Sequence, residues 1–217
     1  MKKIILIGDS IRQGYDKYVK MAFEGVAEVY YPDTNCRFTA NILRHIVDWK
    51  EEMKCGDDVD VVHWNAGVWD NLILMDGRNH TEIEVYRANV ERICQFIKML
   101  FPNAKNIFAT STPVDEELFR VKFESKNIMR LNSDTEIYNQ TAINIVREHG
   151  GDINDLYGLL KDRQSEYHSD QTHFYTKEGT RVITNQVIEC IENALGIKAK
   201  QLDYDLLFDK KDDAIGM

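Results

Sequence analysis

Three residues near the two ends of the chain have the types and the spacing required for nucleophilic attack on an acyl group. Ser10 lies close to the N-terminus, and Asp170 and His173 stand three residues apart far along the chain. Acyl transfer from an ester needs a nucleophile, a base that takes its proton, a group that orients the base, and donors for the oxyanion that develops. We therefore interpret Ser10 as the nucleophile and His173 as the base. A spacing of three residues in a loop or a first helical turn lets Asp170 reach Nδ1 of the imidazole.

The proposed nucleophile follows a strand that the sequence predicts to be buried. Residues 4–7 are an unbroken run of branched apolar residues, and Gly8 and Asp9 close this run in a tight turn. Ligand crevices of open parallel sheets form outside the carboxyl ends of the strands, and Ser10 stands at such an end. The structural alternative is that Asp9 or Ser10 only caps the following helix.

Strands and helices alternate along the rest of the chain. Strand-forming runs predict strands over residues 4–7, 27–31, 59–64, 106–110 and 152–153. Apolar residues at helical spacing predict helices over residues 15–25, 39–53, 81–102, 133–150 and 183–195. This alternation implies an α/β protein, a three-layer α/β/α sandwich with a parallel sheet of about five strands. The flavodoxin-like strand order 2-1-3-4-5 is the predicted topology.

Two sequence motifs predict where central helices begin. Thr81-x-x-Glu84 and Ser133-x-x-Glu136 both match the capping box, in which a hydroxyl and a carboxylate satisfy the first backbone N–H groups of a helix. The residues between, 111–132, are charged and only weakly periodic, and the stretch is longer than an ordinary loop. A lid, a short helix and a contact surface are the alternatives for this segment.

The first and last chemical motifs together resemble those of a known family. Ile7-Gly8-Asp9-Ser10 and Asp170-x-x-His173 look like the first and last blocks of the SGNH, or GDSL-type, hydrolases. Asp155-Leu156-Tyr157 and Gly179 also fit that family, and the order of strands and helices agrees over residues 3–195. This resemblance implies an esterase, lipase or carbohydrate deacetylase that uses no cofactor. It also implies a catalytic serine, an Asp-x-x-His pair and a three-part oxyanion hole.

The second block departs from the family's pattern. The family usually has a Gly after the second strand, whose backbone N–H joins the oxyanion hole, whereas this chain has Asn35-Cys36-Arg37-Phe38-Thr39. A backbone N–H is present on any residue except Pro, so Cys36 or Arg37 could donate it. The Arg37 side chain could instead bind an acidic group of the substrate or pair with an acidic residue of the chain.

The third block also departs, because Gly67-Val68-Trp69-Asp70 stands where the family usually has Gly-x-Asn-Asp. Loss of an oxyanion donor costs roughly 10²–10³ in rate, so we expect a neighbouring amide to replace the missing Asn. Asn65 is the predicted substitute, with Asn71 and Asn35 as alternatives, and ordering of the loop is the other role open to Asn65. The predicted oxyanion hole thus contains Ser10, Arg37 and Asn65.

Two further residues near the nucleophile are candidates for contact with the substrate. Trp69 could stack on a sugar ring if it is exposed at this edge, although tryptophans are usual core material. Asp9 is the second candidate, and its alternative role is to bond the amides of the turn. No long apolar segment suggests a tunnel for an acyl chain, so a small acyl group such as acetyl is preferred, on a small-molecule or carbohydrate ester.

Composition excludes several other classes of function. A formal net charge of −9 works against binding to nucleic acid or to an anionic membrane. No apolar run approaches the roughly 20 residues of a membrane span, and the run after Met1 is too short for a signal peptide, so we expect a cytoplasmic protein. The four cysteines have no Cys-x-x-Cys spacing and the histidines no His-Glu-x-x-His pair, so no metal site is expected.

These observations predict one hydrolase domain over residues 1–200 and an acidic C-terminal tail over residues 201–217, whose few apolar residues dock. The predicted function is that of a serine ester hydrolase that acts through a Ser-His-Asp triad and a covalent acyl-enzyme. An acyltransferase that uses the same intermediate is one alternative. A non-catalytic carbohydrate- or ligand-binding module with the same fold is the other.

Overall fold

A single parallel sheet forms the centre of the computed structural model, which describes residues 1–209. Its order is β2-β1-β3-β4-β5, which confirms the predicted fold class and topology. All four neighbouring pairs are parallel. The strands are β1 (Lys2–Ile7), β2 (Ala27–Tyr30), β3 (Val61–Trp64), β4 (Lys105–Ala109) and β5 (Asp152–Asn154).

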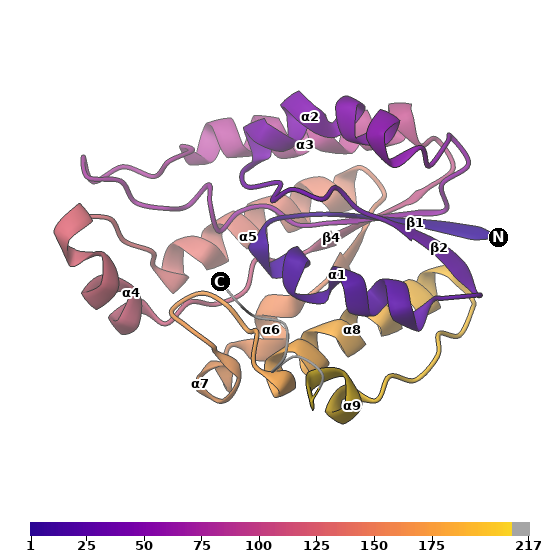
Figure 1. Cartoon of the computed structure of the whole chain (residues 1–217). Coiled ribbons are helices and arrows are strands. Elements are labelled where there is room, and N and C mark those ends of the chain that lie inside the picture. Colours follow the sequence, from indigo (N-terminus) through magenta and orange to yellow (C-terminus); the bar gives the residue numbers. More distant parts are fainter. Residues whose placement is uncertain (210–217) are drawn as a thin grey trace.

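Helices cover both faces of this sheet (Figure 1). On one face lie α1 (Ser10–Ala22) and α8 (Lys177–Leu195), which pack against each other. On the other face lie α2 (Thr39–Met53), α3 (Ile83–Leu100) and α5 (Asn132–Glu148). The shorter helices are α4 (Glu116–Phe123), η1 (Glu124–Lys126), α6 (Leu156–Leu160), α7 (Gln164–Tyr167) and α9 (Tyr204–Asp209).

Side chains of β1 alternate between two apolar cores because successive residues of a strand point to opposite faces. Ile4 and Leu6 pack in the core beneath α1 and α8, and Ile5 and Ile7 pack in the core beneath α2, α3 and α5. All four side chains are buried. The chain therefore leaves β1 at a fixed point of the sheet's carboxyl edge.

Both capping-box predictions are wrong. The N-cap of α3 is Glu82 and that of α5 is Leu131, and neither makes a side-chain capping bond. Thr81 lies one residue before the observed N-cap of α3, and Ser133 lies two residues after that of α5. The Thr81 N–H donates to the Asp70 carbonyl oxygen at 2.9 Å.

The segment over residues 111–132 contains α4 and η1 and is held at both ends. Asn132 closes it, since its Oδ1 accepts from the Val114 N–H at 2.9 Å and its Nδ2 donates to the Val114 carbonyl oxygen at 2.9 Å. Further along the chain, the Gln171 carbonyl oxygen accepts from the Asp115 N–H at 3.0 Å. Of the three alternatives for this segment, a short helix is present, and it lies against the loop that carries Asp170 and His173.

The beginning of the predicted tail packs on the sheet domain. Tyr204 of α9 donates to Asn185 Oδ1 at 3.0 Å, and the rings of Tyr18 and Phe208 stack with centroids 6.0 Å apart. Residues 210–217, the rest of the predicted tail, lie outside the described residues. The domain boundary at residue 200 stays a prediction.

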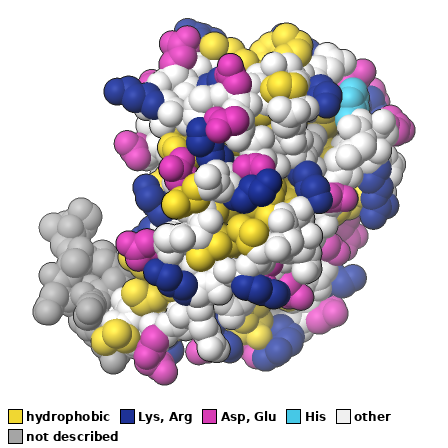
Figure 2. Space-filling view, turned by 90° about the vertical axis from the view of Figure 1, so that its right-hand side faces the viewer, with side chains coloured by type: hydrophobic (Ala, Val, Ile, Leu, Met, Phe, Trp, Pro, Cys, Tyr) yellow, Lys and Arg dark blue, Asp and Glu magenta, His cyan; other side chains and the backbone are white. Residues whose placement is uncertain are grey.

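Charged side chains of both signs are interspersed on the side of the molecule that carries the N-terminus (Figure 2). No single-sign patch dominates this view. Among the described helices, none combines the length and the apolar character needed to cross a membrane.

Two isoleucines of α5 provide a test of which helix face supports the fold. The sequence pattern places Ile137 and Ile145 on one apolar stripe, but Ile137 is 54% exposed and Ile145 only 5%. We expect Ile145→Ala to lower the free energy of unfolding by about 2–5 kcal/mol, because it leaves a cavity in the core. Ile137→Ala is the matched control and should change it by less than about 0.5 kcal/mol. Urea unfolding measures both, and equal effects would contradict this packing.

Candidate active site

Ser10 is the first residue of α1, in the turn that follows β1. The Asp9 carboxylate accepts a hydrogen bond from the Ile11 N–H at 2.9 Å and so caps this helix. Helix α1 thus begins at Ser10, five residues before the predicted start. The half-buried serine stands at the positive end of the helix dipole, where negative charge is stabilised.

The structure corrects the prediction that Asp9 contacts the substrate. Asp9 is fully buried, so its carboxylate has no surface to offer a ligand. Burial raises the pKa of Asp9, while hydrogen bonding from Asn65 and Ile11 and the positive charge of Arg130 act in the opposite direction. Its role in the structure is to fix the turn that presents Ser10.

Ser10, His173 and Asp170 form one hydrogen-bonded chain. The distance from Ser10 Oγ to His173 Nε2 is 2.9 Å, and that from His173 Nδ1 to Asp170 Oδ2 is 2.8 Å. Both distances lie in the range that proton transfer between a nucleophile and its base requires. A serine and a histidine separated by 163 positions are therefore in direct contact at the sheet's carboxyl edge.

The Asp170 carboxylate is held by its own loop. Oδ1 accepts from the backbone N–H groups of Thr172 and His173, each at 2.8 Å, which leaves Oδ2 for the imidazole. Partial burial would raise the pKa of Asp170, but the hydrogen bonds from His173 and from these two N–H groups lower it below its ordinary value. The carboxylate is therefore ionised at neutral pH and able to orient the imidazole.

The loop after β3 is anchored at both ends. The buried Asp70 carboxylate accepts from Thr39 Oγ1 at 2.6 Å and from the Thr39 N–H, which ties the loop to the start of α2. Gly67 has a φ of 148°, and a Cβ at this position would lie 2.5 Å from Ser111 Oγ, so only glycine fits. Trp69 lies between these anchors and is half-buried.

The backbone N–H of Arg37 already has a hydrogen-bond acceptor in this structure. This N–H donates to Asn35 Oδ1 at 2.8 Å, within its own turn, and the Cys36 N–H donates to the Gly8 carbonyl oxygen at 3.0 Å. In this structure the Arg37 N–H is thus engaged within its own turn, and its role as an oxyanion donor stays a prediction. Arg37 adopts a left-handed φ of 56°, a conformation that favours Gly, at the place where the family usually has one.

The three candidate amides differ in what they contact. Asn71 Nδ2 donates to Thr135 Oγ1 at 2.8 Å, whereas the bond of Asn35 in the turn just described uses its Oδ1 as an acceptor. Asn65 is buried beside the nucleophile's turn, since a Cβ on Gly8 would fall 1.9 Å from Asn65 Oδ1. Of the three, Asn65 is the amide next to the turn of Ser10, and its role as a donor stays a prediction.

Arg130 is a buried cation at this edge that the sequence analysis does not single out. It is 8% exposed, and its Nε donates to the Val68 carbonyl oxygen at 2.7 Å and its Nη1 to Thr172 Oγ1 at 3.4 Å. Its guanidinium also lies 5.0 Å from the centre of the Phe119 ring. Arg130 therefore joins the loop of Trp69 to the loop of His173. Its place in a charged segment carries no periodicity that would have identified it.

Two other titratable groups lie buried in the strands and loops behind the site. His63 on β3 accepts a hydrogen bond from Asn154 Nδ2 at 3.0 Å, and burial lowers its pKa to about 4. Burial raises the pKa of Asp70 to about 6, although the bonds from Thr39 oppose this rise. Within residues 1–209, no three His, Cys, Asp or Glu side chains are grouped so as to hold a metal ion.

Comparisons with known proteins give a consistent set of similarities. The chain is 26% identical over 215 residues to a GDSL esterase/lipase of Arabidopsis thaliana, a match that covers 88% of this chain and 86% of the relative. It is 30% identical over 132 residues to the isoamyl acetate-hydrolyzing esterase 1 homolog of Homo sapiens, covering 58% of this chain and 53% of the relative. No family model matches the chain.

Solved structures share the same fold. The lipase/acylhydrolase from Enterococcus faecalis superimposes with a TM-score of 0.68 at 21% sequence identity. The match covers 93% of this chain and 100% of the Enterococcus faecalis chain. The similarity in fold therefore extends over nearly the whole chain.

Asp70 and His63 are expected to make stability depend on pH with opposite signs. Between pH 3.8 and about 6, Asp70 binds more protons in the folded protein than in the unfolded chain. Its contribution to the free energy of unfolding is therefore lost as the pH rises through this range. Folded His63 binds fewer protons between pH 6.5 and about 4, so its contribution is lost as the pH falls.

We therefore expect the free energy of unfolding of Asp70→Asn, relative to that of the parent protein, to increase by about 2–3 kcal/mol as the pH rises from 4 to 7. For His63→Gln, the free energy of unfolding relative to that of the parent protein should decrease by a similar amount over the same rise in pH. This variant serves as the control of opposite sign. Urea unfolding at the two pH values measures both. Parallel changes in the two variants would contradict the burial of these groups.

Proposed function

The chain belongs to the GDSL, or SGNH, family of esterases and lipases, and on this premise we propose that it is a serine ester hydrolase with Ser10, His173 and Asp170 as its triad. The observation that carries the proposal is the continuous hydrogen-bonded chain from Ser10 Oγ through the imidazole to Asp170 Oδ2. A nucleophile, a base and an orienting carboxylate in this geometry perform acyl transfer on several unrelated folds.

In the proposed reaction, His173 Nε2 takes the proton of Ser10 as Oγ bonds to the ester carbonyl carbon. The resulting oxyanion collapses, the bond to the alcohol oxygen breaks, and the imidazolium gives its proton to the departing alcohol. Water, deprotonated by the same imidazole, then attacks the acyl-enzyme and releases the acid and free Ser10. Asp170 holds the imidazole in the required tautomer and stabilises the imidazolium in both steps.

The first turn of α1 is the proposed centre of the oxyanion hole. Ser10 supplies a backbone N–H at the start of the helix, where N–H groups have no intrahelical acceptor and the helix dipole favours negative charge. Asn65 is the proposed side-chain donor, because it lies against the turn formed by Gly8 and Asp9. Arg130 adds a buried positive charge at the same edge, which favours the developing oxyanion.

A small acyl group is the proposed substrate class, with acetyl as the leading member. The human relative is named as a homolog of an esterase that hydrolyses isoamyl acetate, an acetic ester. The apolar cavity beside α1 and the His173 loop has a volume of only 10 Å³, about that of one water, so it does not accept an acyl chain. Partly exposed Trp69 is the proposed surface for the alcohol portion, which includes a sugar ring.

Covalent labelling tests the assignment of the nucleophile. We expect a fluorophosphonate to modify Ser10, as mapped by mass spectrometry, and Ser10→Ala to lower hydrolysis of p-nitrophenyl acetate by about 10³-fold or more. Ser133→Ala, on the exposed first turn of α5, is the control and should keep full activity. Labelling at another residue, or equal hydrolysis by Ser10→Ala, would remove Ser10 from the mechanism. Absence of any labelling would favour a non-catalytic binding module.

A further inference from the structure

Tyr175 contacts both ends of the Ser10–His173 hydrogen bond without belonging to the triad. Its hydroxyl donates to the backbone carbonyl oxygen of Ser10 at 2.6 Å. Its ring stacks on the imidazole of His173, with centroids 4.7 Å apart and planes inclined by 21°. One side chain thus holds the backbone of the proposed nucleophile and the plane of the proposed base.

The backbone of Tyr175 is fixed by the same turn that fixes His173. The Ser169 hydroxyl accepts from the Tyr175 N–H at 3.1 Å, and it donates to the His173 carbonyl oxygen at 3.1 Å. The Ser169 N–H donates to that same carbonyl oxygen at 2.7 Å. The ring of Tyr175 and the ring of His173 therefore start from one rigid piece of backbone.

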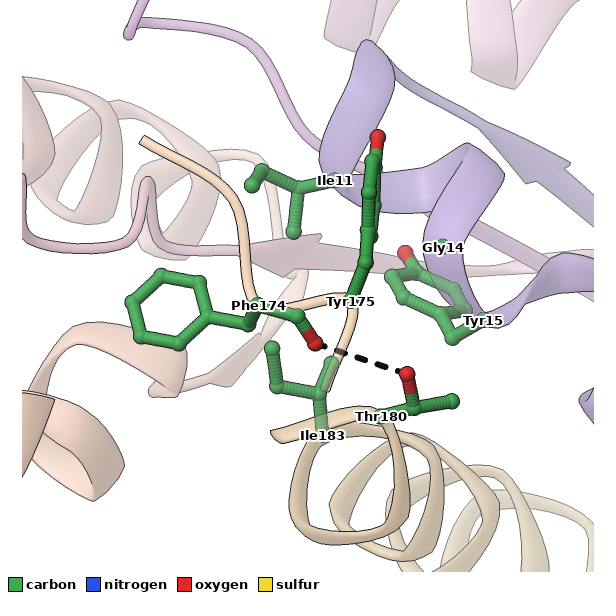
Figure 3. A pocket seen from close by; sticks show the side chains of 7 residues that line it. All are labelled: Ile11, Gly14, Tyr15, Phe174, Tyr175, Thr180 and Ile183. Atoms are coloured by element: carbon green, nitrogen blue, oxygen red, sulfur yellow. Dashed lines mark hydrogen bonds between the residues drawn. The ribbon is translucent and has the colours of Figure 1, made fainter. Parts of the chain in front are cut away.

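Helix α1 provides a matching surface for the tyrosine ring. Gly14 lies one turn after Ser10, and a Cβ on Gly14 would fall 2.7 Å from Cε1 of Tyr175. Figure 3 shows the ring standing against α1 between Ile11 and Gly14, above the small apolar cavity lined also by Phe174 and Ile183. The absence of a side chain at Gly14 is what allows the ring to lie this close to the helix.

We propose that Tyr175 is a positioning residue that holds the His173 loop against the first turn of α1 and so keeps Nε2 within reach of Ser10 Oγ. The proposal rests on the proposed function, because it assigns Tyr175 to the same triad. Tyr175 acts through Ser10 and His173, since its hydroxyl is bonded to a backbone oxygen. Burial raises the pKa of this hydroxyl to about 12, so it stays protonated and remains a donor at neutral pH.

Three variants separate the two contacts. Tyr175→Phe keeps the stacked ring and loses the hydrogen bond, and we expect kcat for p-nitrophenyl acetate to fall about 2- to 10-fold. Tyr175→Leu loses both contacts and should lower kcat by about 10- to 100-fold. Gly14→Ala leaves Tyr175 intact but pushes its ring away, and we expect a fall in kcat between these two. Alanine is a better helix former than glycine, so Gly14→Ala does not weaken α1.

The rate of fluorophosphonate labelling distinguishes positioning from loss of folded protein. A positioning defect lowers the rate constant of labelling in parallel with kcat, leaves KM unchanged, and still allows the whole sample to be labelled at long times. A folding defect lowers the final labelled fraction at an unchanged rate. The control is Tyr157→Phe, which removes a hydroxyl that donates to Glu136 Oε1 at 3.1 Å, away from the triad.

Parent-like labelling rates in all three Tyr175 and Gly14 variants, with the parent protein labelled at Ser10, would overturn the role of Tyr175 alone. A fall in the final labelled fraction at an unchanged rate would also overturn it. Failure of the parent protein to be labelled at Ser10 would overturn the proposed function and this inference together.

Discussion

β1 has no free face and no free edge. It pairs with β2 on one side and with β3 on the other, and Ile4–Ile7 are buried in the two cores above and below the sheet. A shift of one residue would exchange these two sets of side chains, so the register of β1 is strongly fixed. The position of Ser10 follows from that register, because only Gly8 and Asp9 separate it from the strand.

The electrostatics of the site depend on charges that the fold has buried. Asp9 and Asp70 are carboxyls without access to solvent, and burial raises the pKa of each. Arg130 is a buried cation near Asp9, and although burial lowers its pKa to about 10 it stays charged at neutral pH. Its positive charge favours ionised Asp9, and its hydrogen bonds hold two loops. The same guanidinium thus contributes to the charge balance and to the geometry of the site.

The alternation of strand and helix patterns was sufficient to predict the layers of the fold, and the expected flavodoxin-like strand order is confirmed. The proposed triad came instead from residue types, their spacing and the resemblance of two motifs to those of a family. These depend on local patterns: the buried run of β1, helical stripes such as that of α2, and the short spacing between Asp170 and His173. The helix starts at Thr81 and Ser133 were wrong, because contacts between elements outweigh a four-residue motif. Neither spacing nor composition could have indicated these contacts.

The oxyanion hole and the supporting residues were harder to predict for the same reason. Whether the Arg37 N–H donates to Asn35 Oδ1 depends on the rotamer of Asn35, which a sequence does not specify. Arg130 and Tyr175 matter through partners 62 and 165 positions away. Tyr175 stands two residues after His173, and that proximity is the one signal that could have drawn attention to it.

The separation of 163 positions between Ser10 and His173 has a consequence for synthesis of the chain. The proposed nucleophile leaves the ribosome first, and the base follows only when β1 to β5 have already been made. The contact that joins them closes a very long loop, which is intrinsically a late and slow event in folding. On the proposed function, a nascent chain therefore carries the serine without its base until α8, the helix that follows His173, packs against α1.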